Sequence, residues 1–140
     1  MRGLPTPADL PTADVVIYDG ECRFCQAQVA RIHAWDGRGR LAFVSLHDPL
    51  VAQRWPQLTH QQLMAEMHLV TAAGQIYRGA QSLRYLTRRL PWLWWLAPAL
   101  HIPGTLPLWN WLYGLVARNR YRWGKVESCA DGNCKVHLRK

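Results

Sequence analysis

Short apolar runs alternate with turn-forming residues along the first part of the chain. Residues 41–44 and, after Asp14, residues 15–18 are apolar and contain β-branched or aromatic side chains, which predicts two buried strands at residues 14–18 and 41–44. Between them, residues 26–32 place Val29 and Ile32 on one face of a helix. Because a single helix joins the two strands, we expect them to be parallel, with a right-handed crossover.

The pattern continues with short elements up to residue 90. We expect helices at residues 49–55 and 59–63, strands at residues 67–71 and 75–77 around the turn Ala72-Ala73-Gly74, and a helix at residues 79–90. In the last helix, Leu83, Leu86 and Leu90 share one face. The resulting order, βαβαββα, predicts an α/β fold.

A long apolar segment follows, because residues 90–117 contain no formally charged side chain. It holds Trp92, Trp94, Trp95, Trp109 and Trp111. Its length alone would permit a membrane span, but four prolines and Gly104 divide it into two short helices, expected near residues 92–101 and 106–118. We expect a Trp-rich α-helical C-terminal extension that packs on the sheet. Contact with a membrane interface is the less favoured alternative, and spanning is the least favoured, since helix breaks in lipid need protein neighbours.

Two cysteines separated by two residues come directly after the first strand. Asp19-Gly20 forms a turn, and Cys22 and Cys25 then stand at the start of the next helix. The free N–H groups and the dipole at a helix N-terminus favour an anion, so a thiol there ionises more readily. A Cys-x-x-Cys pair beside a strand–helix unit is typical of a thioredoxin-like redox motif. Together with the element order, it predicts a thioredoxin-like, glutaredoxin-sized βαβαββα core.

The same residues carry a resemblance to a known family. Asp19-Gly20-Glu21-Cys22-Arg23-Phe24-Cys25 resembles the signature of the DCC family of small thiol-disulfide oxidoreductase-like proteins, named for that aspartate and the two cysteines. Residues 67–70, 76–80 and 113–124 also resemble the family, in its order, so that the resemblance covers roughly residues 15–124. It implies a thioredoxin-like fold and thiol-disulfide exchange, for which we expect no bound cofactor.

The residues of this motif are assigned candidate roles. Cys22 is the candidate nucleophile, because it is nearer the helix start and is expected to be the more exposed, and Cys25 is the candidate resolving thiol. Arg23 and the helix dipole should lower the pKa of Cys22, whereas the acidic neighbours Asp19 and Glu21 should raise it. The sign of the net shift therefore stays open. Asp19 is either a proton acceptor for Cys25 or a turn residue that caps the helix with its carboxylate.

Other candidate residues leave alternatives open. Cys129 and Cys134 flank a turn-rich loop and could form their own disulfide, relay electrons to the first pair, or complete a four-thiolate zinc site with it. A non-enzymatic metal-binding or interaction module, with the cysteines as zinc ligands, is thus the alternative to an oxidoreductase. For His33 and His68, a core or surface position is favoured over a catalytic one. Thioredoxin-like folds usually place a cis-proline before the third strand, where this chain has Ala65-Glu66-Met67.

Length and composition fit one domain. The chain has 140 residues, of which 49% are hydrophobic, enough to form a core. We expect a flexible N-terminal lead-in at residues 1–13, the thioredoxin-like domain at residues 14–124 with its helical extension from about residue 91, and a basic, cysteine-containing tail at residues 125–140. Residues 1–13 lack the apolar region of a signal peptide, so we expect a cytoplasmic, reducing location.

The formal net charge of +8 is concentrated toward the end of the chain. From Tyr113 onward, seven Lys and Arg residues stand against two acidic residues, a net charge of +5. Such a segment could meet nucleic acid, anionic lipid or acidic partners, but a solvated basic tail is favoured. The arginines of residues 118–123 are expected to face water from a helix end. We expect no nucleic-acid partner, and a protein or small-molecule disulfide or thiol as substrate.

Overall fold

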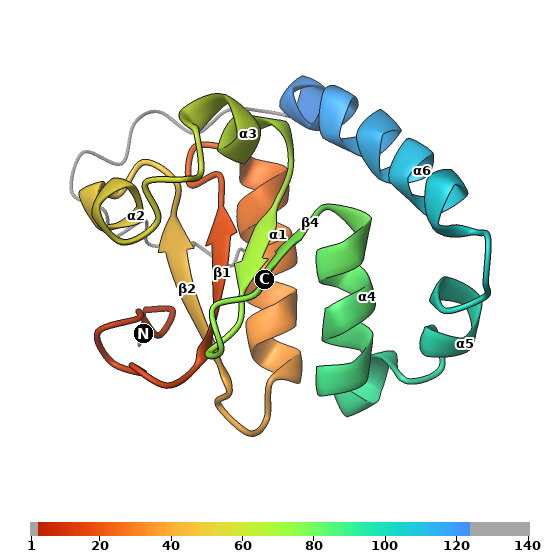
Figure 1. Ribbon diagram of the computed structural model, residues 1–140, viewed down its shortest axis with the longest axis horizontal. Helices are drawn as coiled ribbons and strands as arrows, with labels where there is room; N and C mark the ends of the chain where they lie inside the picture. The colour runs from red at the N-terminus through yellow and green to blue at the C-terminus, as the bar shows by residue number, and fades with distance from the viewer. Residues whose placement is uncertain (1–2, 124–140) are drawn as a thin grey trace.

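A four-stranded mixed sheet lies at the centre of the computed structural model, which describes residues 3–123 (Figure 1). The strands are β1 (Asp14–Tyr18), β2 (Leu41–Ser45), β3 (His68–Val70) and β4 (Ile76–Arg78), in the spatial order β2-β1-β3-β4. β1 and β2 are parallel, β3 is antiparallel to β1, and β4 is antiparallel to β3. The predicted parallel pair and hairpin are therefore confirmed.

Four helices accompany the sheet. They are α1 (Arg23–Trp35), α2 (Pro49–Arg54), α3 (His60–Ala65) and α4 (Ala80–Arg89), close to the predicted positions. The local sequence explains where the two shortest helices, α2 and α3, begin. The Asp48 carboxylate accepts from the Leu50 N–H at 2.9 Å, and Thr59 and Gln62 form a capping box at the start of α3.

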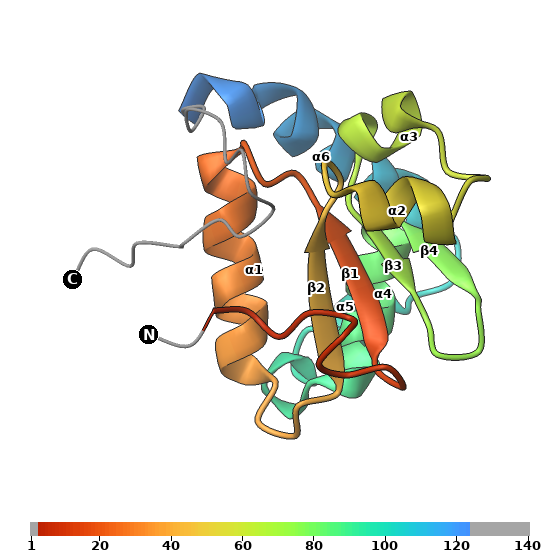
Figure 2. The ribbon, with the colours of Figure 1, turned by 90° about the vertical axis from the view of Figure 1, so that its left-hand side faces the viewer.

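The sheet separates two hydrophobic layers. Val16 and Tyr18 of β1 point to the layer that contains Val29 of α1 and Leu86 of α4. The intervening Val15 and Ile17 point to the opposite layer, which contains side chains of α2 and α3. Figure 2 shows α1 on one side of the sheet and α2 with α3 on the other. The result is a mixed α/β fold compatible with the thioredoxin-like fold expected from the sequence.

Part of the expected N-terminal lead-in contacts this core. The Phe43 N–H at the edge of β2 donates to the Pro5 carbonyl at 2.8 Å. Leu4 packs against the layer of α1 and α4, and Leu10 packs against the opposite layer. Residues 4–10 therefore extend both sides of the core.

The segment after α4 folds as short pieces. They are the 3-10 turn η1 (Pro91–Leu93), α5 (Ala97–Leu100), α6 (Leu106–Asn119) and the 3-10 turn η2 (Arg120–Trp123). The helix expected at residues 92–101 is broken, because Pro98 has no N–H to donate to the carbonyl four residues earlier. The main contacts of η1, α5 and α6 are with α4, and those of η2 include α1, rather than with the strands of the sheet. Among residues 3–123, no helix is long and apolar enough to cross a bilayer.

Candidate active site

Cys22 occupies the N-cap of α1, directly after the turn that follows β1. Its sulfur accepts a hydrogen bond from the Cys25 N–H at 3.3 Å, where serine, threonine or aspartate oxygens usually serve. The backbone N–H of Gln26 donates to the Cys22 carbonyl at 3.0 Å and completes the first helical turn. The expected placement of the pair at a helix N-terminus is thus observed, and the two residues lie close together.

The exposure of the two cysteines is the reverse of the expectation. Cys22 is 0% exposed, and Cys25 is half-buried. The prediction that Cys22 is the more exposed thiol is wrong, because a capping side chain turns back over the first helical turn instead of pointing outward. A partner disulfide must therefore gain access to a sulfur that is covered in this conformation.

The two thiols titrate as an unequal pair. The hydrogen bond from the Cys25 side chain lowers the pKa of Cys22 to about 7, against the opposing effect of burial. The Cys25 backbone N–H and the positive charge of Arg120 lower it further, whereas Asp19 raises it. The same hydrogen bond, with burial, raises the pKa of Cys25 far above the usual range of a thiol. Of the two thiols, Cys22 therefore has the lower pKa.

Arg120 is the main residue that sequence reasoning missed. It is only 4% exposed, and its Nη1 donates to Cys25 Sγ at 3.7 Å. Its Nη2 lies 3.8 Å from Asp19 Oδ2 and donates to the Met64 carbonyl at the end of α3. The expectation that the arginines near this helix end face water is wrong for Arg120.

A helical periodicity distinguishes this arginine from its neighbours. Arg118 and Arg122 are both exposed, as expected. A step of two residues turns a helix by about 200°, so a residue midway between two exposed ones faces the protein. This spacing was the signal available for Arg120.

Asp19 is buried beside the pair. Its Oδ1 accepts from the Glu21 N–H at 3.0 Å, which is the turn role expected for it. The helix cap itself is the Cys22 sulfur rather than this carboxylate. The negative charge of Asp19 raises the pKa of both thiols.

His47 is a second residue that the sequence did not single out. Its Nε2 lies 3.3 Å from Asp19 Oδ1 and 4.0 Å from Glu21 Oε2, and its side chain is partly exposed. It stands two residues past the end of β2. Because parallel strands end at the same edge of a sheet, a histidine there comes close to the turn after β1.

α6 contributes a further contact beside the site. The Tyr113 hydroxyl accepts from the Met67 N–H at 2.9 Å, and burial raises the pKa of Tyr113 to about 12. Met67 belongs to the stretch where a thioredoxin-like fold usually has its cis-proline. A backbone donor of that stretch is therefore occupied by a side chain of the C-terminal segment.

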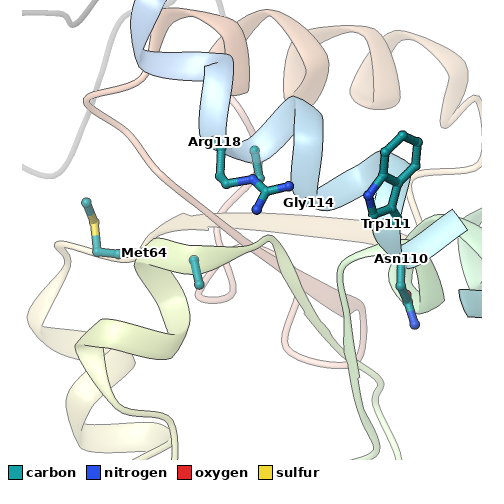
Figure 3. Close-up of a pocket in the computed structure, with 7 residues that line it drawn as sticks. Met64, Asn110, Trp111, Gly114 and Arg118 are labelled. Atoms are coloured by element: carbon teal, nitrogen blue, oxygen red, sulfur yellow. The ribbon is translucent and has the colours of Figure 1, made fainter. Parts of the chain in front are cut away.

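A groove of about 540 Å³ lies between α3 and α6 (Figure 3). It is lined by Met64, Ala65, Asn110, Trp111, Gly114, Ala117 and Arg118. Met64 also accepts the hydrogen bond of Arg120, which contacts Cys25. A single residue, Arg120, therefore connects the groove to the thiol pair.

The other candidate residues lie elsewhere or outside the described part. His33 is exposed on α1, and its ring meets Phe43 edge-on at 5.8 Å. His68 is buried in β3, where desolvation lowers its pKa. These positions agree with the non-catalytic interpretation of both histidines. Within residues 3–123 no group of three or more His, Cys, Asp or Glu could hold a metal ion, and Cys129 and Cys134 lie outside that range.

Comparisons with known proteins agree with this chemistry. A family model described as DCC1-like thiol-disulfide oxidoreductase matches residues 16–126. The chain is 28% identical over 125 residues to a Bacillus subtilis (strain 168) protein that carries the name "Uncharacterized protein YuxK", covering 82% of this chain and 84% of that protein. No solved structure matches.

Proposed function

The chain belongs to the DCC1-like thiol-disulfide oxidoreductase family, and we propose that it exchanges disulfides with a protein or small-molecule partner through Cys22 and Cys25 on a thioredoxin-like fold. One observation carries most of this proposal: the Cys22 sulfur caps α1 and accepts from the Cys25 N–H at 3.3 Å. That arrangement stabilises negative charge on one thiol of the pair, which is what a nucleophilic cysteine requires.

In the first step Cys22 attacks. Its thiolate forms a bond to one sulfur of the partner disulfide, and the S–S bond of the partner breaks. The leaving thiolate takes a proton from solvent. The lowered pKa of Cys22 supports this role, because a thiol whose pKa lies near ambient pH combines a large thiolate fraction with good nucleophilicity.

In the second step Cys25 resolves the mixed disulfide. It loses its proton and attacks Cys22 Sγ, so that the Cys22–Cys25 bond forms and the second partner thiolate leaves. The partner gains two electrons and the pair loses two. Formation of the mixed disulfide removes the Cys22 thiolate, which is the main cause of the raised pKa of Cys25. The resolving thiol therefore becomes easier to ionise when it is needed.

Two groups beside Cys25 serve this second step. Arg120, whose Nη1 is 3.7 Å from Cys25 Sγ, stabilises the Cys25 thiolate as it develops. Asp19 is a candidate acceptor for the Cys25 proton, and His47, bound to Asp19 at 3.3 Å and partly exposed, can pass that proton to water.

Because Cys22 is 0% exposed, access to its sulfur requires a local movement, and we assign that movement to η2 and the adjoining end of α6. Three contacts tie this segment to the site: Arg120 donates to the Met64 carbonyl and to Cys25 Sγ, and Tyr113 accepts from the Met67 N–H. We infer that exchange proceeds from a conformation in which these contacts have opened and the Cys22 sulfur is uncovered.

Trapping of mixed disulfides tests the roles directly. The variants Cys22→Ser and Cys25→Ser, each with Cys129 and Cys134 also replaced by serine, are incubated with glutathione disulfide and analysed by mass spectrometry. The Cys25→Ser variant is expected to accumulate a glutathione adduct on Cys22, and the Cys22→Ser variant almost none. Equal trapping by both variants would overturn the assignment of roles, and no adduct on either would overturn the exchange chemistry.

A further inference from the structure

The large apolar side chains that face solvent are concentrated in one segment. Within the described part of the chain, all of the exposed ones except Trp35 lie between residues 92 and 116: Trp92, Trp94, Trp95, Ile102, Leu108, Trp111, Leu115 and Val116. The first three indoles are 72%, 62% and 76% exposed. Single exposed apolar residues are common on protein surfaces, whereas a group of this kind indicates a surface that binds something.

α6 directs its apolar stripe outward. Leu108, Trp111 and Leu115 follow one another at steps of three and four residues, so they share one face of the helix. They are 53%, 58% and 41% exposed, and no residue of α6 is fully buried. A further step of three leads to Arg118, which is also exposed. The solvent-exposed face of α6, which borders the groove beside α3, is thus an apolar stripe that ends in a cation.

The charge around this segment has one sign. Residues 67–123 contain seven arginines and no aspartate or glutamate. Arg89 is paired with Asp14 at 3.2 Å, and Arg120 lies in the thiol site. Arg88, Arg118 and Arg122 are exposed. Indoles and guanidinium groups are therefore available to solvent from the same part of the protein.

We propose that this surface, called the tryptophan face and made of the eight exposed apolar residues of 92–116 together with Arg118 and Arg122, docks on the surface of an anionic lipid bilayer. Indole rings prefer the headgroup level of a membrane, because one end is apolar and the other donates a hydrogen bond. Arg118 and Arg122, at the C-terminal end of α6 and in η2, can bind lipid phosphates. Figure 1 shows α5 and α6 on the side of α4 that faces away from β1 and β2, so this segment can approach a plane without displacing the sheet.

The charge pattern favours this occupant over two others. A symmetric contact with a second copy would place Arg118 and Arg122 of both copies in one interface, and residues 67–123 offer no acidic side chain to pair with them. Residues 124–140 carry four Lys or Arg against two Asp or Glu, so they have the same sign of charge as the face. An anionic surface complements both the cations and the indoles.

This inference reverses the preference drawn from the sequence, which favoured packing on the sheet over contact with a membrane interface. It does not depend on the cysteine chemistry. The sequence favoured burial of the tryptophans on the sheet, but the proline breaks leave short helices whose contacts are mainly with α4. The outer sides of those helices then keep their apolar residues in water.

Vesicle binding by the full chain tests the proposal. Sedimentation is measured with vesicles of phosphatidylcholine alone and of phosphatidylcholine mixed with phosphatidylglycerol, at low and high salt, and tryptophan fluorescence is recorded. We expect binding to the anionic vesicles with a blue shift, and weaker binding at high salt. The Trp94→Ser/Trp95→Ser variant should lose about tenfold or more in partitioning, and Arg118→Gln/Arg122→Gln should lose mainly the preference for anionic vesicles.

The matched control is Trp35→Ser, which removes an exposed indole of α1 outside the tryptophan face. It should leave vesicle binding within about twofold. Absence of binding to anionic vesicles at low salt would overturn the proposal. Equal binding by all variants would also overturn it, because the basic residues elsewhere in the chain would then account for the attraction. A wild-type dimer that Trp94→Ser/Trp95→Ser converts to a monomer, without vesicle binding, would assign the face to self-association instead.

Discussion

The Arg120 guanidinium contacts the Cys25 sulfur at 3.7 Å, although 95 residues separate the two in the chain. The same side chain reaches Asp19 and the Met64 carbonyl, so it joins η2 to the turn after β1 and to the end of α3. A buried cation beside two thiols and a carboxylate stabilises whichever of them is ionised. The C-terminal segment is thereby part of the thiol site.

Replacing Arg120 tests this contribution. Arg120 lowers the pKa of Cys22, so Arg120→Met should raise that pKa and reduce alkylation of Cys22 at pH 7 by roughly three- to tenfold. Arg120→Lys keeps the charge and should recover part of the rate. The pH dependence of iodoacetamide labelling measures both. The control is Arg122→Met, which removes an exposed arginine two residues away. An unchanged pH profile for Arg120→Met would show that the guanidinium does not act on the thiol.

The Cys25 thiol should have the largest effect on the ionisation of Cys22. The hydrogen bond from the Cys25 side chain is the largest cause of the Cys22 pKa of about 7, so alkylation of Cys22 should rise with pH with a midpoint near 7 and then level off. Cys25→Ala removes the donor and should move that midpoint upward, whereas Cys25→Ser keeps a hydroxyl donor and should move it less. Labelling rates from pH 5 to 10 give the midpoints. Equal midpoints for the two variants would contradict this cause.

Asp19→Asn separates the two roles considered for Asp19. The amide oxygen can still accept from the Glu21 N–H, so the turn is preserved, but it cannot take up a proton. As a proton acceptor, Asp19 would be needed in the resolving step, which should slow about tenfold or more, while attack by Cys22 should not slow. Stopped-flow release of the second thiol from a preformed mixed disulfide measures the step. A faster resolving step would contradict the role of Asp19 as proton acceptor, and would leave it as a turn residue whose charge raises the pKa of the thiols.

The contact between Tyr113 and Met67 should limit access to Cys22. Tyr113→Phe removes the acceptor of a backbone N–H, which should lower the free energy of unfolding by about 1 kcal/mol and loosen α6. Alkylation of Cys22 well above pH 7, where it is fully ionised, should then become faster. Tyr77→Phe is the control, because the Tyr77 hydroxyl contacts the exposed Gln75 at 3.1 Å. Equal labelling rates in the Tyr113→Phe and Tyr77→Phe variants would show that α6 does not limit access to Cys22.

The sheet and the placement of the cysteines were predictable because their signals are local. β-branched runs, turn residues and helical spacing each act within a few positions, and they located β1, α1 and β2 within a few residues of their ends. The helix predicted over residues 92–101 was wrong for a reason present in the sequence, because Pro98 in its interior cannot donate to the carbonyl four residues earlier.

The surroundings of the thiols were less predictable. Arg120, His47 and Tyr113 reach the site only because distant elements pack together. Helical spacing could distinguish Arg120 from Arg118 and Arg122, but a single sequence carries no direct signal for the residues that it contacts. The burial of Cys22 depends on the rotamer of a capping side chain. The exposed tryptophans depend on which side of α6 meets α4, which composition does not decide.

A redox titration of the Cys22–Cys25 pair tests the proposed exchange chemistry most directly. The protein with Cys129 and Cys134 replaced by serine is equilibrated in glutathione buffers, trapped by alkylation and analysed by mass spectrometry. The peptide that contains both thiols should lose two hydrogens in a single two-electron transition, reversible by dithiothreitol, with a potential in the range of roughly −270 to −120 mV. Two thiols that remain open to alkylation in every buffer would contradict thiol-disulfide exchange by this pair.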